Sequence, residues 1–167
     1  MFDNWKWLIG TYWIVPEANL AAPVFASEGD PIWLSDQTVW HIVGSANGYF
    51  WGDTAVRMVP PPASGQESKP AAQRLTASIT PEGNIHMTFI PVDSADDAEG
   101  PIGIGNMRWR DGSWTAQMQM SAPFGSDRQV LHWASMVQCT PDDPEWERLP
   151  GTSQSLPDFM QAAGFTG

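Results

Sequence analysis

Positive charge and cysteine are both scarce in this sequence of 167 residues. It carries 8 Lys and Arg residues against 19 Asp and Glu residues, which gives a formal net charge of −11. Binding to nucleic acid or to an anionic membrane depends on clustered positive charge, so we expect neither as a partner. The one cysteine, Cys139, excludes a disulfide bond within the chain.

Long apolar runs and cofactor motifs are also missing. No segment approaches the ~20 apolar residues of a membrane span, and residues 1–6 lack the basic region and apolar run of a secretion signal, so we expect a cytoplasmic protein. The sequence contains no phosphate-binding loop, serine elbow or dinucleotide fingerprint. Its three histidines are too widely separated for a zinc or iron site. We therefore expect no cofactor and no metal, with a haem on an inward-facing His132 as the alternative.

Tryptophan, by contrast, is abundant. Ten tryptophans stand against seven phenylalanines and two tyrosines. So much indole surface either fills a core or lines a cavity for a flat apolar molecule. Composition leaves both interpretations open.

Two turn sequences predict antiparallel hairpins with a matched register. Asp111-Gly112 favours a two-residue loop, because both residues tolerate a positive φ. This loop places Trp109 opposite Trp114, and alternate pairs beyond it are also apolar or glycine: Met107–Ala116, Gly105–Met118 and Gly103–Met120. A three-residue loop at residues 81–83 aligns three apolar pairs in the same way: Ile79–Ile85, Ala77–Met87 and Leu75–Phe89. Each hairpin therefore has one apolar and one polar face, and His86 points outward.

Strand-like runs extend this pattern over most of the chain. Strands are predicted at residues 5–15, 20–26, 37–44, 49–59, 74–79, 84–91, 102–110, 113–121 and 128–139. We expect the loops at 60–73 and 92–101 to be mobile and to flank a cavity mouth. The tail, residues 140–167, contains a short predicted helix that Ser155 can cap. Residues 1–167 are expected to form one domain.

Consecutive hairpins leave two exposed sheet edges unless the sheet closes, and eight strands close around side chains or one small ligand. The sequence thus predicts an all-β, antiparallel up-and-down barrel of about eight strands with a short C-terminal helix. The segment Gly10-Thr11-Tyr12-Trp13 resembles the Gly-x-Trp signature of the calycins, with one extra residue. Over most of its length the chain resembles the lipocalin-like barrels of that group. The resemblance implies an apolar internal cavity and a carrier function.

Candidate catalytic residues come from the hairpin around Ala46-Asn47-Gly48. A three-residue loop there pairs His41 with Asp53, Gln37 with Arg57, and Val43 with Trp51. One face of the hairpin then carries several side chains of chemical interest: His41, Tyr49, Trp51, Asp53 and Arg57. A histidine beside a carboxylate is an acid–base pair poised near neutral pH, and an arginine can hold a carboxylate or an enolate. The opposite face is more apolar, so the His41 face points either into the barrel or to solvent.

Two further residues could take part in catalysis. Tyr12 supplies a phenol on the first strand, and His132 lies in a strand of which either face could be buried. We expect a cofactor-independent lyase, isomerase or cyclase that acts on an aromatic or polycyclic molecule inside the barrel. The expected ligand-binding residues are Trp13, Trp51, Met107, Trp109, Trp114, Met118 and Met120. The alternatives are a non-catalytic carrier and a packed barrel whose outer face binds a protein; a homodimer is left open.

Overall fold

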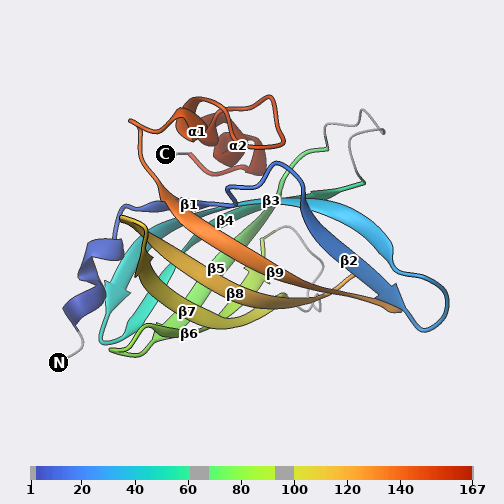
Figure 1. Ribbon diagram of the computed structural model, residues 1–167, viewed down its shortest axis with the longest axis horizontal. Coiled ribbons are helices and arrows are strands. Elements are labelled where there is room, and N and C mark those ends of the chain that lie inside the picture. The colour runs from blue at the N-terminus through green and yellow to red at the C-terminus, as the bar shows by residue number, and fades with distance from the viewer. Residues whose placement is uncertain (1–2, 61–67, 93–99, 167) are drawn as a thin grey trace.

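The computed structural model describes residues 3–60, 68–92 and 100–166, and most of these form antiparallel sheet (Figure 1). The strands are β1 (Tyr12–Ile14), β2 (Leu20–Ala26), β3 (Ile32–Ala46), β4 (Tyr49–Val59), β5 (Ala71–Ile79), β6 (Asn84–Pro91), β7 (Ile102–Arg110), β8 (Ser113–Pro123) and β9 (Arg128–Cys139). A 3-10 helix, η1 (Asp3–Leu8), precedes the sheet. Two α-helices, α1 (Pro144–Glu147) and α2 (Leu156–Ala163), follow it.

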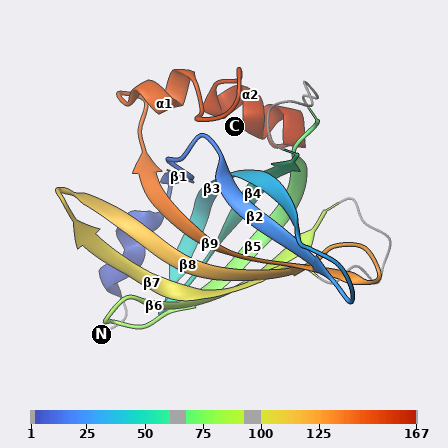
Figure 2. The same cartoon turned by 45° about the vertical axis from the view of Figure 1, so that its right-hand side comes forward.

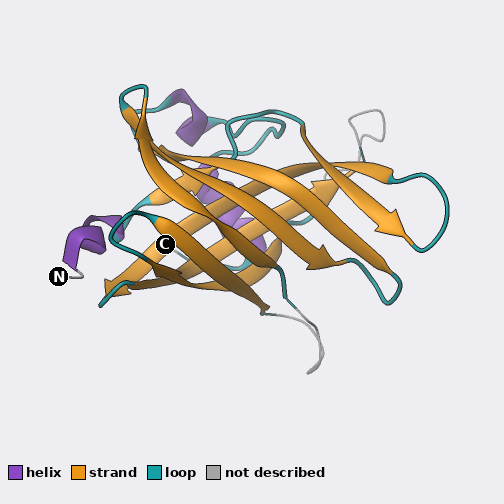
Figure 3. Cartoon of the chain, turned by 60° about the horizontal axis from the view of Figure 1, so that its bottom comes forward, coloured by secondary structure: helices purple, strands orange, loops and turns teal. Residues whose placement is uncertain are grey.

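The strands close into an antiparallel barrel with eight strand positions (Figure 3). From β3 to β9 each strand pairs with the next along the chain. Strands β1 and β2 share the remaining position, because both pair with β3 on one side and with β9 on the other. The predicted fold class is confirmed, and closure leaves these strands without a free edge.

The turns set the register of the hairpins. At Asp111 and Gly112, whose φ angles are 52° and 84°, the two-residue loop and all four predicted pairs are confirmed. The register across residues 81–83 is also confirmed, with Gly83 at a φ of 88°. Positive φ at these positions is what a tight hairpin loop requires.

The hairpin between β3 and β4 differs from the prediction near its turn. Asn47 and Gly48 form a two-residue turn, and Trp51 lies opposite Gly44. The predicted Val43–Trp51 pair is therefore wrong. A bulge between residues 42 and 44 absorbs the shift, so the predicted His41–Asp53 pair is confirmed.

Residues 5–15 do not form the predicted first strand. Residues 3–8 form η1, and only β1 remains of the strand. Trp5 and Trp7 instead cover one end of the barrel: the indole Nε1 of Trp5 donates to the carbonyl of Thr80 at 3.0 Å, and Trp7 stacks on Trp114 at 5.1 Å between ring centroids. This end, where the short hairpin turns lie, is called the turn end below.

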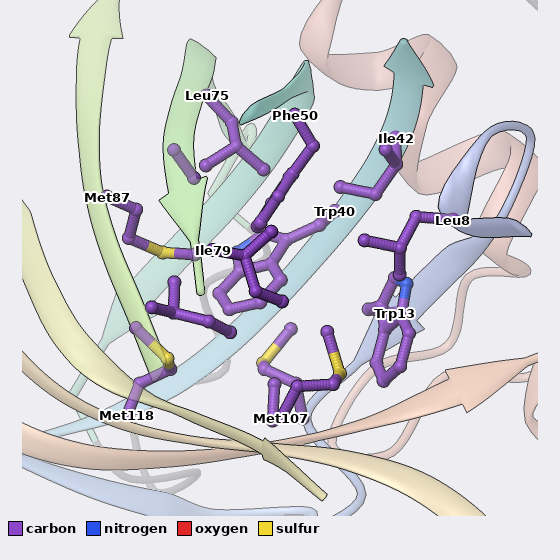
Figure 4. Packing of buried hydrophobic residues seen from close by; sticks show 14 of the residues in the cluster. Leu8, Trp13, Trp40, Ile42, Phe50, Leu75, Ile79, Met87, Met107 and Met118 are labelled. Atoms are coloured by element: carbon purple, nitrogen blue, oxygen red, sulfur yellow. The ribbon is translucent and has the colours of Figure 1, made fainter. Parts of the chain in front are cut away.

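The barrel interior next to the turn end is filled by large side chains. Trp13, Trp40, Phe50 and Met118 reach it from separate strands and are buried (Figure 4). On β7, Gly105 makes room for the methionine opposite it, because a Cβ at that position would lie 2.6 Å from the Met118 sulfur. Tryptophan therefore fills the core of this end of the barrel.

Residues 140–166, called the C-terminal segment below, lie against the outside of the barrel (Figure 2). Helix α2 begins after Ser155, whose side chain accepts a hydrogen bond from the Asp158 amide at 3.2 Å, so the predicted helix and cap are confirmed. Its buried residues pack on outward-facing residues of five strands: Ile14, Val39, Ala55, Ala72 and Cys139. None of the helices in the described ranges is long and apolar enough to span a bilayer.

The other boundaries agree closely with prediction. Strands β2, β4, β6, β7 and β9 have the predicted bounds, whereas β3 begins at residue 32 rather than 37. In the two loops predicted to be mobile, residues 61–67 and 93–99 lie outside the described residues.

Candidate functional site

A cavity of about 240 Å³ lies inside the barrel, away from the turn end. We call it the barrel cavity. Its lining includes Asp36, Thr38, Trp40, Thr54, Val56, Met58, Gln73, Phe89, Pro91, Pro101, Met120, Ala122, Pro123, Phe124, Val130, His132, Ala134 and Met136. Aromatic and methionine side chains make up much of the wall, and the polar groups are few. Pro91 and Pro101 are the described residues of this lining that lie on either side of residues 93–99 in the sequence.

Strand alternation explains how β3 contributes to this wall. Asp36, Thr38 and Trp40 are two residues apart, so their side chains fall on the same face of the strand. The buried Ile42 continues that face into the core at the turn end. The polar residues Asp36 and Thr38 thus lie where the apolar pattern of the strand predicts only core.

Asp36 is the buried acidic group of the barrel cavity, with 3% of its surface exposed. The Thr38 hydroxyl donates a hydrogen bond to its Oδ1 at 2.8 Å. Burial raises the pKa of Asp36, and the nearby His132 imidazole and the Thr38 hydrogen bond oppose that shift. Because burial dominates, the carboxyl holds its proton at a higher pH than an exposed aspartate does.

His132 lies in the same cavity, as the inward alternative for this residue expected. Its Nδ1 is 2.9 Å from the backbone carbonyl of Trp133. Since a carbonyl oxygen only accepts hydrogen bonds, Nδ1 carries the donated proton.

Two other polar groups of the lining residues have no hydrogen-bond partner. The indole Nε1 of Trp40 and the hydroxyl of Thr54 are buried and unpaired, and each residue is 1% exposed. The two residues are direct cross-strand partners on β3 and β4. Buried polar groups are nearly always paired, so these two mark a place where a partner is needed.

The predicted catalytic face of the second hairpin points outward. Tyr49 and Trp51 are exposed, and neither they nor His41, Asp53 and Arg57 line the barrel cavity. The barrel wall separates this set from His132. Of the two orientations left open by the sequence, the outward one is observed, although the face is only partly open to solvent because the C-terminal segment covers it.

His41 forms a compact cluster with its neighbours on the outer face. Its ring stacks on Tyr12 at 4.2 Å between centroids, and Trp146 packs edge-on against Tyr12 at 5.2 Å. Burial lowers the pKa of His41, and the negative charge of Asp53 opposes that shift. Burial raises the pKa of Tyr12, and the charge of Asp53 adds to that shift. Asp53 itself is held by a salt bridge from Arg74.

Arg57 lies under the C-terminal segment, not beside the His41 imidazole. Its Nη2 donates to the Gly151 carbonyl at 3.1 Å, and its guanidinium lies 5.8 Å from the centroid of the Phe159 ring. It therefore anchors the C-terminal segment to β4. An outer groove of about 290 Å³ separates that segment from β1 and is lined in part by Tyr12, Trp146 and Met160.

The predicted ligand-binding residues are dispersed. Met120 lines the barrel cavity, whereas Trp13, Met107 and Met118 are buried in the core and Trp114 packs against it. Trp51 and Trp109 are exposed, by 44% and 61%. The sequence patterns did not predict Asp36 and Thr54 as site residues. A polar residue on the otherwise apolar face of a strand is the feature that could have indicated them.

Compared with protein-family models, with curated protein sequences and with solved structures, the chain matches none. The class of the protein therefore follows from its fold and cavity: a closed antiparallel β-barrel with eight strand positions.

Asp36 gives the site a measurable pH dependence. Between the ordinary aspartate pKa of 3.8 and the raised native value, the folded protein binds more protons than the unfolded chain. Stability contributed by the protonated carboxyl is therefore lost as the pH rises through this window. We expect Asp36→Asn to raise the free energy of unfolding at pH 7 by about 1–3 kcal/mol, because the neutral amide avoids the cost of protonating the buried carboxyl or of burying its charge at that pH.

Urea unfolding of both proteins between pH 4 and pH 7 measures this effect. The gain from Asp36→Asn should shrink toward pH 4. Asp127→Asn is the control, because that carboxylate is 73% exposed and should change stability little at any pH. A gain that grows toward pH 4 would show that Asp36 is stabilised as its charged form.

Proposed function

We propose that this protein binds a small apolar molecule in the barrel cavity, as a lipocalin-like member of the calycin group. The observation that carries the proposal is the cavity itself, about 240 Å³ of space inside a closed barrel. A buried apolar cavity of about 150 Å³ accepts benzene, and pockets for drug-sized ligands begin near 300 Å³. A bicyclic aromatic molecule therefore suits the available volume.

The composition of the wall supports an aromatic ligand. Trp40 and Phe89 supply ring surfaces, with their centroids 6.3 Å apart. Met120 and Met136 supply flexible, polarizable side chains that adapt to an irregular shape. The resemblance of Gly10-Thr11-Tyr12-Trp13 to the calycin signature favours the same conclusion.

Isothermal titration calorimetry with 2-isopropylnaphthalene tests the proposal. We expect one molecule to bind per chain, with a negative change in heat capacity from apolar burial. Mass spectrometry of the mixture after incubation shows whether the compound is recovered unchanged. The absence of binding by this compound and by its polar analogues described below would overturn the proposal.

A second candidate function is cofactor-free acid–base catalysis on the bound molecule. The specific observation in its favour is Asp36, a buried carboxyl with a raised pKa in the same cavity as His132. A buried carboxyl that holds its proton more tightly than an exposed one can act as a general acid or base, as a lyase, isomerase or cyclase requires. If the protein is an enzyme, Asp36→Asn should abolish turnover but retain binding, and His41→Ala should leave both unchanged. Loss of turnover in His41→Ala alone would place the chemistry on the outer face.

A further inference from the structure

We propose that the barrel cavity selects an uncharged ligand with a carbonyl oxygen, which accepts hydrogen bonds from the indole N–H of Trp40 and the hydroxyl of Thr54. This inference rests on the binding function proposed above. It adds the chemical class of the polar end of the ligand and the two residues that recognise it.

The indole N–H of Trp40 and the hydroxyl of Thr54 are both unpaired. Both residues line the cavity, and their polar atoms have no hydrogen-bond partner within the protein. They lie directly opposite each other across the β3–β4 ladder, and neither polar atom has exposed surface, so a ligand oxygen reaches them when the two side chains turn toward the cavity. A ligand oxygen would remove the cost of two unpaired buried groups at once.

The chemistry of these groups restricts the ligand. An indole N–H can only donate a hydrogen bond, so its partner must be an acceptor. A hydrocarbon offers no acceptor, and an ammonium group offers only donors. A carbonyl oxygen has two lone pairs and can accept from both Trp40 and Thr54.

The charges of the lining decide against an anion. The described lining residues include no lysine or arginine; Asp36 is the acid among them, and His132, the basic side chain of the lining, already acts on the charge of Asp36. Burying a carboxylate there would place it without a strong cationic partner and near a second carboxyl, at a high cost. An uncharged oxygen avoids this cost.

An ammonium group paired with Asp36 is the main rival. Asp36, however, already accepts a hydrogen bond from Thr38, and His132 is close enough to act on its charge. Trp40 and Thr54 have no partner at all. The two donors therefore lack an acceptor, and the carbonyl oxygen of the ligand supplies one.

Four naphthalenes with different substituents at one position test the inference. These are 2-acetylnaphthalene, its near-isostere 2-isopropylnaphthalene, 2-naphthoate and 2-(aminomethyl)naphthalene, which is cationic at pH 7. We expect the ketone to bind most tightly, with at least about fivefold higher affinity than the isopropyl compound, the usual net effect of two neutral hydrogen bonds. Calorimetry with the full-length chain measures all four.

Two variants assign that preference to its residues. Thr54→Val keeps the shape of the side chain and removes the hydroxyl, and Trp40→Phe removes the indole N–H. Each variant should reduce the preference for the ketone over the isopropyl compound. Thr76→Val is the matched control, because Thr76 is exposed on the outer face of β5, and it should keep the full preference.

The outcomes separate this inference from the function on which it rests. If the ketone and the isopropyl compound bind equally well, the cavity binds apolar molecules but carbonyl recognition is overturned. If the ammonium compound binds most tightly, Asp36 is the recognition group and the inference is again wrong. If none of the four binds, the proposed function fails, and the inference fails with it.

Discussion

Ala134→Phe should abolish ligand binding, or reduce affinity by at least about tenfold, the equivalent of 1.4 kcal/mol. Ala134 is buried on β9, and its side chain forms part of the cavity wall. A phenyl ring at this position would occupy space that the ligand needs. The added ring itself is expected to cost about 1–3 kcal/mol of stability through overpacking, so the variant should remain folded.

Ser135→Phe is the matched control for this change. Neighbouring residues of a strand point to opposite faces, so the ring at residue 135 lies outside the barrel. It should leave ligand affinity within about twofold, well under the tenfold step of 1.4 kcal/mol. Calorimetry and thermal unfolding of both variants separate a blocked cavity from a damaged fold. Undiminished binding by a folded Ala134→Phe protein would place the ligand elsewhere.

Phe159→Ala should lower the free energy of unfolding by about 3–5 kcal/mol, the range measured for buried aromatic residues. Phe159 is fully buried between α2 and the outside of the barrel. Its loss leaves a cavity in that layer and removes the ring from the Arg57 guanidinium, which lies 5.8 Å from its centroid. Arg57 would then keep the Gly151 carbonyl as its partner in the C-terminal segment.

Gln161→Ala is the control on the same helix, because Gln161 is exposed. We expect it to change stability by less than about 0.5 kcal/mol, as is usual for surface positions. Chemical denaturation measures the global effect, and amide hydrogen exchange shows whether the C-terminal segment opens before the barrel. If Phe159→Ala is as stable as the parent, the packing of α2 contributes nothing to the fold.

Much of the barrel could be predicted because hairpin registers are local. At Asp111-Gly112 the loop length and the strict alternation of side chains fix each other, so one correct turn aligns every pair along β7 and β8. The hairpin around Asn47 shows the limit of this reasoning. Its bulge lies where the Trp51 ring packs over Gly44, and the local sequence pattern does not predict this contact.

The orientation of the His41 face could not be predicted, because it depends on a distant segment. A half-buried histidine on a strand usually faces the interior of a barrel or lines a binding site. Here the burial comes from outside, where Tyr12 stacks on His41 and Trp146 packs edge-on against Tyr12. Nothing within β3 or β4 shows that residues about a hundred positions later will cover that face.

Met120 and His132 of the barrel cavity were predicted as site residues, but Asp36 was missed for a related reason. Asp36 precedes the predicted start of its strand, since a buried aspartate contradicts the apolar pattern by which strands are recognised. The observed β3 continues back to Ile32 and places Asp36 inside. Such a conflict between pattern and burial is typical of functional positions.

Methyl NMR of the methionines tests the central claim most directly. Met58, Met120 and Met136 line the barrel cavity, whereas Met160 lines the outer groove beneath the C-terminal segment. With [methyl-13C]methionine-labelled protein, titration with 2-acetylnaphthalene should shift the first three methyl signals and leave Met160 unchanged. A shift of Met160 with the other three unmoved would contradict a ligand site inside the barrel.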